Sequence, residues 1–175
     1  MARLLIVEDE ATDLAILKGI VKGAGHEFYS AWDGEQAYKT YLRTHIDVVI
    51  TDLHMPRVGG IELITAILAL FPEAPIIAVS GKGPELLAEA KKEGAFVTLS
   101  KPVDPEDLLK AIAQALSVVS LSGQGQLIPQ KVLEHPCEVK SQGRVDGEDP
   151  SQAAFSEELR NTLERLRKQM ESGEA

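Results

Sequence analysis

Five short apolar segments alternate with helical patterns along the first two thirds of this 175-residue chain, and this alternation restricts the possible folds more than any other feature. The apolar runs are RLLIV at 3–7, HEFYS at 26–30, DVVIT at 47–51, PIIAVS at 75–80 and FVTLS at 96–100. Short runs rich in β-branched residues are typical of strands that are covered on both faces. Strands that alternate with helices in this way predict an α/β fold, with a parallel sheet between two layers of helices.

The segments between these runs carry the periodicity and the end signals of helices. Apolar residues share one helical face at Leu14, Leu17, Ile20 and Val21, and again at Ile61, Ile64 and Leu68. Pro72 is expected to end the second of these helices, and Gly94 suits a left-handed turn at the end of a later one. Asp104 before Pro105 is typical of a helix N-terminus and predicts the last helix of the domain.

The composition and periodicity of the sequence change after residue 121, so we predict that the domain covers residues 1–121. Residues 122–152 are rich in Gly, Pro, Gln and charged residues, and they are predicted to form a linker. Helical spacing returns at 153–171, where one side carries Phe155, Leu159, Leu163, Leu166 and Met170. This amphipathic helix could dock on its own domain, pair with a second copy in a homodimer, or bind another protein, and its residues leave the three open.

The composition is that of an ordinary globular protein and disfavours two kinds of partner. Acidic residues number 27 against 18 basic ones, for a net charge of -9, so direct binding to nucleic acid is not expected. No apolar run approaches the roughly 18 residues that would cross a bilayer, so membrane insertion is not expected either. A single cysteine, Cys137, and the lack of a signal-peptide pattern favour a cytoplasmic location.

The carboxyl ends of the predicted strands carry the residues of chemical interest. Ligands of open parallel sheets bind outside these ends, so we expect side chains that are distant in the sequence to converge there. They are Glu8 and Asp9 after the first strand, Asp52 after the third, Ser80 after the fourth and Lys101 after the fifth. Clustered carboxylates with few bases suit Mg²⁺, which binds through one or two carboxylates and keeps several waters that a phosphate can replace.

This set of residues indicates phosphoryl transfer. Asp52 can act as a carboxylate nucleophile toward a phosphoryl group and form an aspartyl phosphate. The metal and Lys101 would neutralise the charge on the phosphoryl oxygens, while the Ser80 hydroxyl would donate a hydrogen bond to one of them.

Four motifs occur in the order and at the strand positions of a known family. They are VEDE at 7–10, TDLHMP at 51–56 followed by GG at 59–60, VSG at 79–81 and KKEGAFVTLSKP at 91–102. Together they resemble the receiver domain of bacterial two-component response regulators, from residue 3 to about residue 120. The resemblance implies a flavodoxin-like (βα)5 sandwich with the strand order 2-1-3-4-5.

The resemblance also implies a role in signalling. Asp52 would accept phosphate from a histidine kinase or a phosphotransfer protein, so the protein would be a switch rather than an enzyme. Mg²⁺ would be held by Asp9, Asp52 and the backbone carbonyl of His54, with Glu8 acting largely through water. Phosphorylation would change contacts with a downstream protein that the sequence does not identify. The tail contains no basic recognition helix, so a DNA-binding output is not expected.

Two more expectations concern the strand that precedes the lysine. In this family the peptide before the proline that follows the lysine is typically cis, which predicts a cis bond between Lys101 and Pro102. The family usually has Tyr or Phe three residues before the lysine, where the ring moves inward as the Ser or Thr turns toward the phosphate. Here that position holds Thr98, and Phe96 lies two residues earlier. The aromatic half of the usual switch is therefore missing from its aligned position.

The same residues bear on three other functions. One alternative is a receiver-like scaffold that acts through protein contacts without phosphate. Another is a phosphohydrolase of the haloacid dehalogenase type, but that chemistry needs an acid two residues after the nucleophile, where this chain has His54. A flavodoxin-type phosphate site is disfavoured because the loop EDEATD would repel a phosphate, and no glycine-rich nucleotide motif follows any strand.

Overall fold

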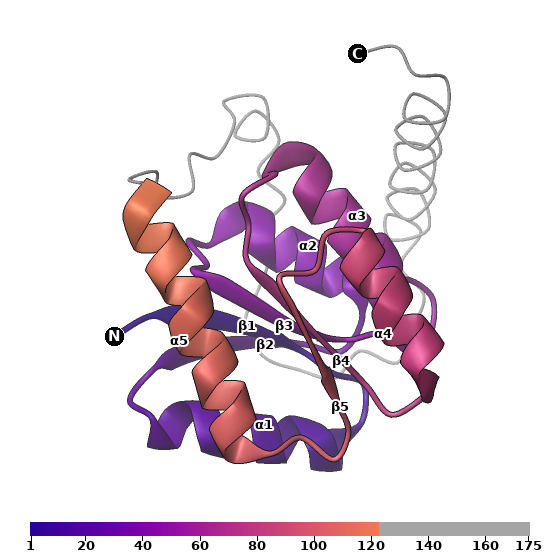
Figure 1. The fold of residues 1–175 in the computed structure, drawn as a ribbon, viewed down its shortest axis with the longest axis horizontal. Coiled ribbons are helices and arrows are strands. Elements are labelled where there is room, and N and C mark those ends of the chain that lie inside the picture. The colour runs from indigo at the N-terminus through magenta and orange to yellow at the C-terminus, as the bar shows by residue number, and fades with distance from the viewer. Residues whose placement is uncertain (123–175) are drawn as a thin grey trace. The chain divides into compact units, whose positions relative to one another are not determined.

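All five apolar runs form strands of one parallel sheet. In the computed structural model, which describes residues 1–122, the strands are β1 (Arg3–Val7), β2 (Glu27–Ala31), β3 (Val48–Asp52), β4 (Ile76–Ser80) and β5 (Val97–Ser100). Their order in the sheet is β2-β1-β3-β4-β5 (Figure 1). This order confirms the predicted flavodoxin-like fold, and each strand boundary lies within one residue of its prediction.

The helices occupy the segments between the strands. They are α1 (Ala11–Gly23), α2 (Gly34–Arg43), α3 (Gly60–Leu70), α4 (Gly83–Lys92) and α5 (Pro105–Ser122). Asp104 caps α5 as predicted, because its Oδ1 accepts the amide hydrogens of Glu106 and Asp107 at 2.8 and 3.2 Å. None of these described helices is both long and apolar enough to cross a membrane. Ser122, the first residue of the predicted linker, is the last residue of α5. The remaining linker residues, 123–152, and the predicted helix at 153–171 lie outside the described residues.

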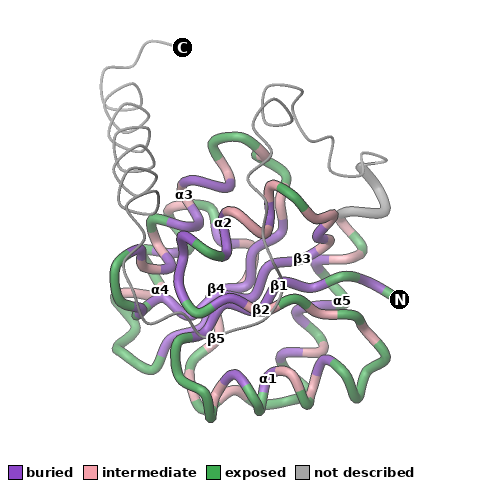
Figure 2. Tube along the Cα trace, turned by 180° about the vertical axis from the view of Figure 1, so that it is seen from behind, coloured by how far each residue is buried: buried purple, intermediate pink, exposed green. Residues whose placement is uncertain are grey.

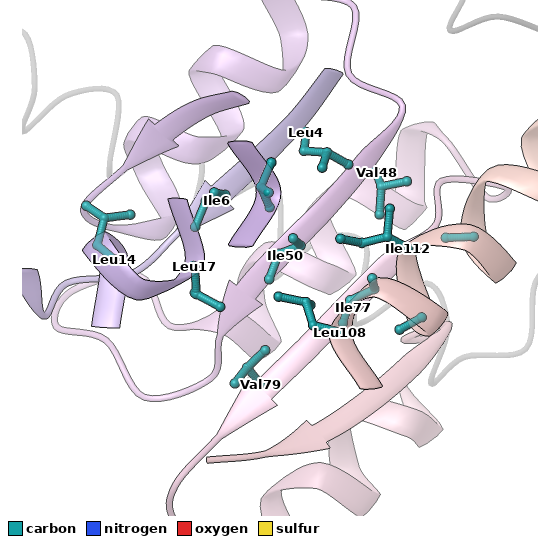
Figure 3. Close-up of a cluster of buried hydrophobic side chains, with 13 residues drawn as sticks. Leu4, Ile6, Leu14, Leu17, Val48, Ile50, Ile77, Val79, Leu108 and Ile112 are labelled. Carbon is teal, nitrogen blue, oxygen red and sulfur yellow. The ribbon is translucent and has the colours of Figure 1, made fainter. Parts of the chain in front are cut away.

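Two layers of helices cover the sheet. In Figure 2, α1 and α5 lie on one side of the sheet, and α2, α3 and α4 lie on the other. The core under α1 and α5 is shown in Figure 3 and contains Leu4, Ile6, Leu14, Leu17, Val21, Val48, Ile50, Ile77, Val79, Leu108, Ala111, Ile112 and Ala115. Every residue of β3 and β4 is buried. A central strand covered on both faces has no solvent side, which explains why these runs are apolar with little alternation.

The register of the strands determines where the residues at the strand ends lie. Val7 at the end of β1 pairs with Thr51 of β3, and Ser80 at the end of β4 pairs with Ser100 at the end of β5. Because all pairs are parallel, the four strands end at the same edge of the sheet. Residues that end these strands or follow them directly are therefore neighbours in space.

Candidate functional site

Four strands bring the predicted site residues to one edge of the sheet. Glu8 follows β1, Asp52 ends β3, Ser80 ends β4 and Lys101 follows β5. The amide of Lys101 donates to the carbonyl oxygen of Ser80 at 2.9 Å, so the ends of β4 and β5 are held together. The peptide between Lys101 and Pro102 is cis, as the resemblance implied.

Three carboxylates form a cluster at this edge. Glu8, Asp9 and Asp52 each place one ligand oxygen within 4.8 Å of the others. Glu8 and Asp52 are buried, whereas Asp9 is exposed, so the cluster is reached from the solvent beside Asp9. Carboxylate oxygens with an open side are the donors that Mg²⁺ prefers, because this ion keeps part of its water shell. The residues thus fit the ion, while the ligand role of the His54 carbonyl stays a prediction.

Lys101 contacts three carboxylates at the same time. Its Nζ lies 2.7 Å from Oε2 of Glu8, 2.8 Å from Oδ2 of Asp13 and 3.5 Å from Oδ2 of Asp52. The lysine therefore lies beside Asp52, but its two shorter contacts are with other acids. Asp13, in the first turn of α1, is not among the site residues that the sequence analysis identifies. It lies in the first turn of the helix that directly follows Glu8 and Asp9, and this nearness to the strand end is the signal by which it could have been found.

Burial, hydrogen bonds and neighbouring charges all shift the pKa values of Glu8 and Lys101. Burial raises the pKa of Glu8 above its ordinary value, while the hydrogen bond from Lys101 lowers it and the charge of Asp52 raises it further. Burial lowers the pKa of Lys101, but the hydrogen bonds to Asp13 and Glu8 and the charge of Asp52 outweigh it, so this pKa is raised. The lysine consequently remains an ammonium at neutral pH and balances a buried carboxylate.

Hydrogen bonds to backbone and side-chain groups hold Asp52 and the residue after it. Oδ1 of Asp52 accepts the amide hydrogen of Leu53 at 2.8 Å. The Thr51 hydroxyl donates to the carbonyl oxygen of Asp52 at 2.8 Å, and the Gly60 amide donates to that of Leu53 at 3.2 Å. The first residue of α3 therefore lies directly against the end of β3. A Cβ atom on Gly60 would lie 2.2 Å from the carbonyl oxygen of Asp52, so this close approach requires glycine.

Ser80, at the end of β4, and His54, in the loop after β3, are the next residues of the site. Ser80 is buried, and its Oγ accepts the amide hydrogen of Lys82 at 3.1 Å. A hydroxyl that accepts in this way still has its own hydrogen to donate to another partner. The exposed side chain of His54 contacts the Lys82 ammonium through Nε2. This contact joins the loop after β3 to the loop after β4.

The position three residues before Lys101 belongs to the middle of β5. It holds Thr98, which is half-buried and pairs with Ala78 of β4. Phe96 lies just before β5 begins and packs against the apolar core under α1 and α5. Phe96 therefore contributes to that core and does not supply the aromatic side chain that the Thr98 position lacks.

The fold and the site define the class of this protein as a flavodoxin-like α/β protein with a cluster of carboxylates, balanced by a lysine, at the carboxyl edge of its sheet. Comparison with known families then narrows the class. Residues 4–113 match the family model of the response regulator receiver domain. The chain therefore belongs to the response regulator receiver domain family, a family of two-component signalling.

Alignments with individual relatives show which share of the chain is similar to them. The chain is similar to the chemotaxis protein CheY of Thermotoga maritima, with 36% identity over 112 residues, which are 63% of this chain and 93% of that protein. It is 33% identical over 117 residues to the transcriptional regulatory protein GlrR of Escherichia coli, but this is 26% of GlrR. A receiver domain protein from Clostridium thermocellum has a similar structure, with a TM-score of 0.67, 33% identity, and coverage of 70% of this chain and 99% of that one.

Proposed function

We propose that this protein is a phosphorylation-dependent signalling switch in which Asp52 is the phosphoacceptor. The observation that carries the proposal is the surroundings of Asp52, whose buried carboxylate clusters with the acids Glu8 and Asp9 and lies 3.5 Å from the ammonium group of Lys101. An acid that served only to cap a turn would not need two further acids from the end of β1 and a cation from the end of β5. Family membership supports the same role, with a histidine kinase or a phosphotransfer protein as the donor.

In this transfer the protein forms one covalent bond, between Asp52 and the phosphoryl group. An Asp52 carboxylate oxygen attacks the phosphorus atom, a new O–P bond forms, and the bond to the donor nitrogen of a phosphohistidine breaks. The imidazole leaves with the electron pair of that bond and takes up a proton. Lys101 neutralises part of the charge on the phosphoryl oxygens and keeps them in place, because positioning and electrostatics supply most of the catalysis in such transfers. Mg²⁺, held by Glu8, Asp9, Asp52 and the His54 carbonyl, would supply the remaining positive charge.

Ser80 links the phosphoryl group to a change of shape. Its hydroxyl hydrogen can be donated to a phosphoryl oxygen on Asp52, and Ser80 begins the loop that leads through Lys82 into α4. A hydrogen bond formed only in the phosphorylated state shifts the population of the loop toward one arrangement. Downstream proteins that distinguish the two arrangements would read the signal. The segment 153–171 is a candidate for transmitting it, by docking, pairing or partner binding.

The proposal is tested by intact mass after incubation with Mg²⁺ and acetyl phosphate. We expect one added phosphoryl group in the native chain, and none in Asp52→Asn or when the metal is chelated. Samples quenched within seconds keep rapid hydrolysis from being mistaken for inertness. No adduct under these conditions would favour the scaffold that works without phosphate, for which the missing aromatic residue at Thr98 is the supporting observation. Continuous release of phosphate from many ester substrates would instead favour the phosphohydrolase.

The burial of Glu8 predicts an acid sensitivity of Mg²⁺ binding. Because its pKa is raised above the ordinary 4.5, Glu8 takes up a proton at a higher pH than an exposed glutamate does. The Mg²⁺ affinity should therefore fall as the pH decreases through this raised pKa, since the protonated cluster carries one negative charge less. Calorimetric titration between neutral and mildly acidic pH measures this change. Glu8→Gln should bind Mg²⁺ more weakly and lose this part of the pH dependence, and an identical pH profile in Glu8→Gln would exclude Glu8 as its source.

A further inference from the structure

Asp13 is an additional acid in contact with the site, and neither the metal cluster nor the phosphoacceptor accounts for it. Its Oδ2 lies 2.8 Å from Nζ of Lys101, a shorter separation than the 3.5 Å between that ammonium and Asp52. The clustered carboxylates that could hold Mg²⁺ are those of Glu8, Asp9 and Asp52, and Asp13 is not among them. Asp13 therefore acts on the site through Lys101.

We propose that Asp13 is a positioning residue that holds the Lys101 ammonium toward α1 and competes for it with a phosphoryl group on Asp52. This inference rests on the proposed function. The Asp13 side chain is 31% exposed and that of Lys101 is 19% exposed, so their ion pair is only partly screened by water. Asp13 stands on the first turn of α1, which is anchored in the core by Leu14 and Leu17, so its carboxylate has a defined place.

The charge of Asp13 has opposite effects on the two ligands of the site. An aspartyl phosphate carries about two negative charges at neutral pH, where the free carboxylate carries one, and the fixed anion of Asp13 repels them and draws Lys101 away. Mg²⁺ is a cation, and Lys101 repels it from the cluster. Asp13 reduces that repulsion because it balances the ammonium charge. Loss of the Asp13 charge should therefore favour phosphorylation and disfavour Mg²⁺ binding.

The experiment compares the native chain with Asp13→Asn, Asp13→Ala and Asp13→Glu. The rate of phosphoryl uptake from acetyl phosphate is measured at saturating Mg²⁺, and the Mg²⁺ dissociation constant is measured by calorimetry without phosphate donor. Both neutral variants should take up phosphate about three- to tenfold faster and bind Mg²⁺ about three- to tenfold more weakly, as expected for one partly exposed charge. Asp13→Glu keeps the charge and should restore both values.

A remote ion pair provides the control. Arg3 and Glu27 begin β1 and β2, at the opposite edge of the sheet, and their side chains are 3.6 Å apart. Glu27→Gln removes the same charge there and should change neither value. A merely structural role for Asp13 would lower both phosphoryl uptake and Mg²⁺ affinity, and that result would overturn the inference.

The outcomes separate this inference from the proposed function. Uptake by the native chain with unchanged values in Asp13→Asn would overturn the role of Asp13 and leave Asp52 as the phosphoacceptor. No uptake by the native chain would overturn the proposed function and, with it, the competition for Lys101.

Discussion

Replacing Gly60 by alanine should destabilise the fold strongly and disturb the site with it. The added Cβ would lie 2.2 Å from the carbonyl oxygen of Asp52 and 2.7 Å from Cα of Leu53. Both are backbone atoms at the end of a buried central strand, so neither can move aside cheaply. We expect the free energy of unfolding to fall by about 3 kcal/mol or more, and any folded protein to bind Mg²⁺ weakly because Asp52 is displaced. Denaturant unfolding and calorimetric titration measure the two effects.

Gly19 is the matched control for this prediction. It lies inside α1, and a Cβ there would meet no atom within 4 Å. Gly19→Ala should therefore stabilise the protein by about 0.5–1 kcal/mol, because alanine loses less backbone freedom in a helix than glycine does. The same substitution is thus expected to act with opposite sign at the two positions. A loss of less than about 1 kcal/mol in Gly60→Ala would contradict the steric explanation, because overpacking in a core typically costs at least that.

Replacing Lys101 by methionine should make folding depend on Mg²⁺. The ammonium is the partner of Glu8, whose side chain is fully buried at 0% exposure, and it also faces Asp13 and Asp52. Breaking a buried ion pair by removing one partner typically costs about 3–5 kcal/mol, part of which Glu8 can avoid by taking up a proton. Mg²⁺ would bind the unbalanced carboxylates without repulsion from the lysine. The rise in melting temperature on adding Mg²⁺ should therefore be larger in Lys101→Met than in the native chain.

Lys110→Met controls for the loss of one positive charge. Lys110 has an exposed side chain and pairs with Glu106 and Asp107 on the surface of α5. Its replacement should change neither the stability nor the response to Mg²⁺ appreciably, since exposed pairs contribute little. Thermal melting of both variants over a range of Mg²⁺ concentrations makes the comparison. An equal response to Mg²⁺ in Lys101→Met and the native chain would show that Lys101 does not oppose the metal.

Much of the fold follows from local patterns that the sequence displays directly. The runs that form β3 and β4 are apolar because both faces of a central strand are covered, and the Asp104 cap is visible as a polar residue before a proline. The convergence of Glu8, Asp52, Ser80 and Lys101 could also be expected, since each ends a strand or follows it directly and parallel strands end together. The strand order came from the resemblance to receiver domains, because local periodicity does not specify which strands are neighbours.

The partners of Lys101 were decided by the tertiary structure. The sequence places Lys101 and Asp52 at the same end of the sheet, whereas the shorter contacts of Lys101 are with Glu8 and Asp13. Which acid a long, flexible side chain reaches depends on the placement of α1 against β5, and no local rule reports that distance. The same holds for the surroundings of Phe96, which lies two residues before Thr98 in the sequence. The strand begins after Phe96, and its ring packs into the core.

The α/β class, the edge of the sheet that carries the chemistry, and the types of group gathered there follow from the sequence alone. Hydrophobic periodicity and strand-end residues are local, so they can be read without coordinates. The pairing of the charges, the place of Asp13 beside the site, and the need for glycine at position 60 become visible in the three-dimensional structure. These features depend on contacts between elements distant in the chain, and a contact of a few ångströms is set by packing rather than by sequence spacing.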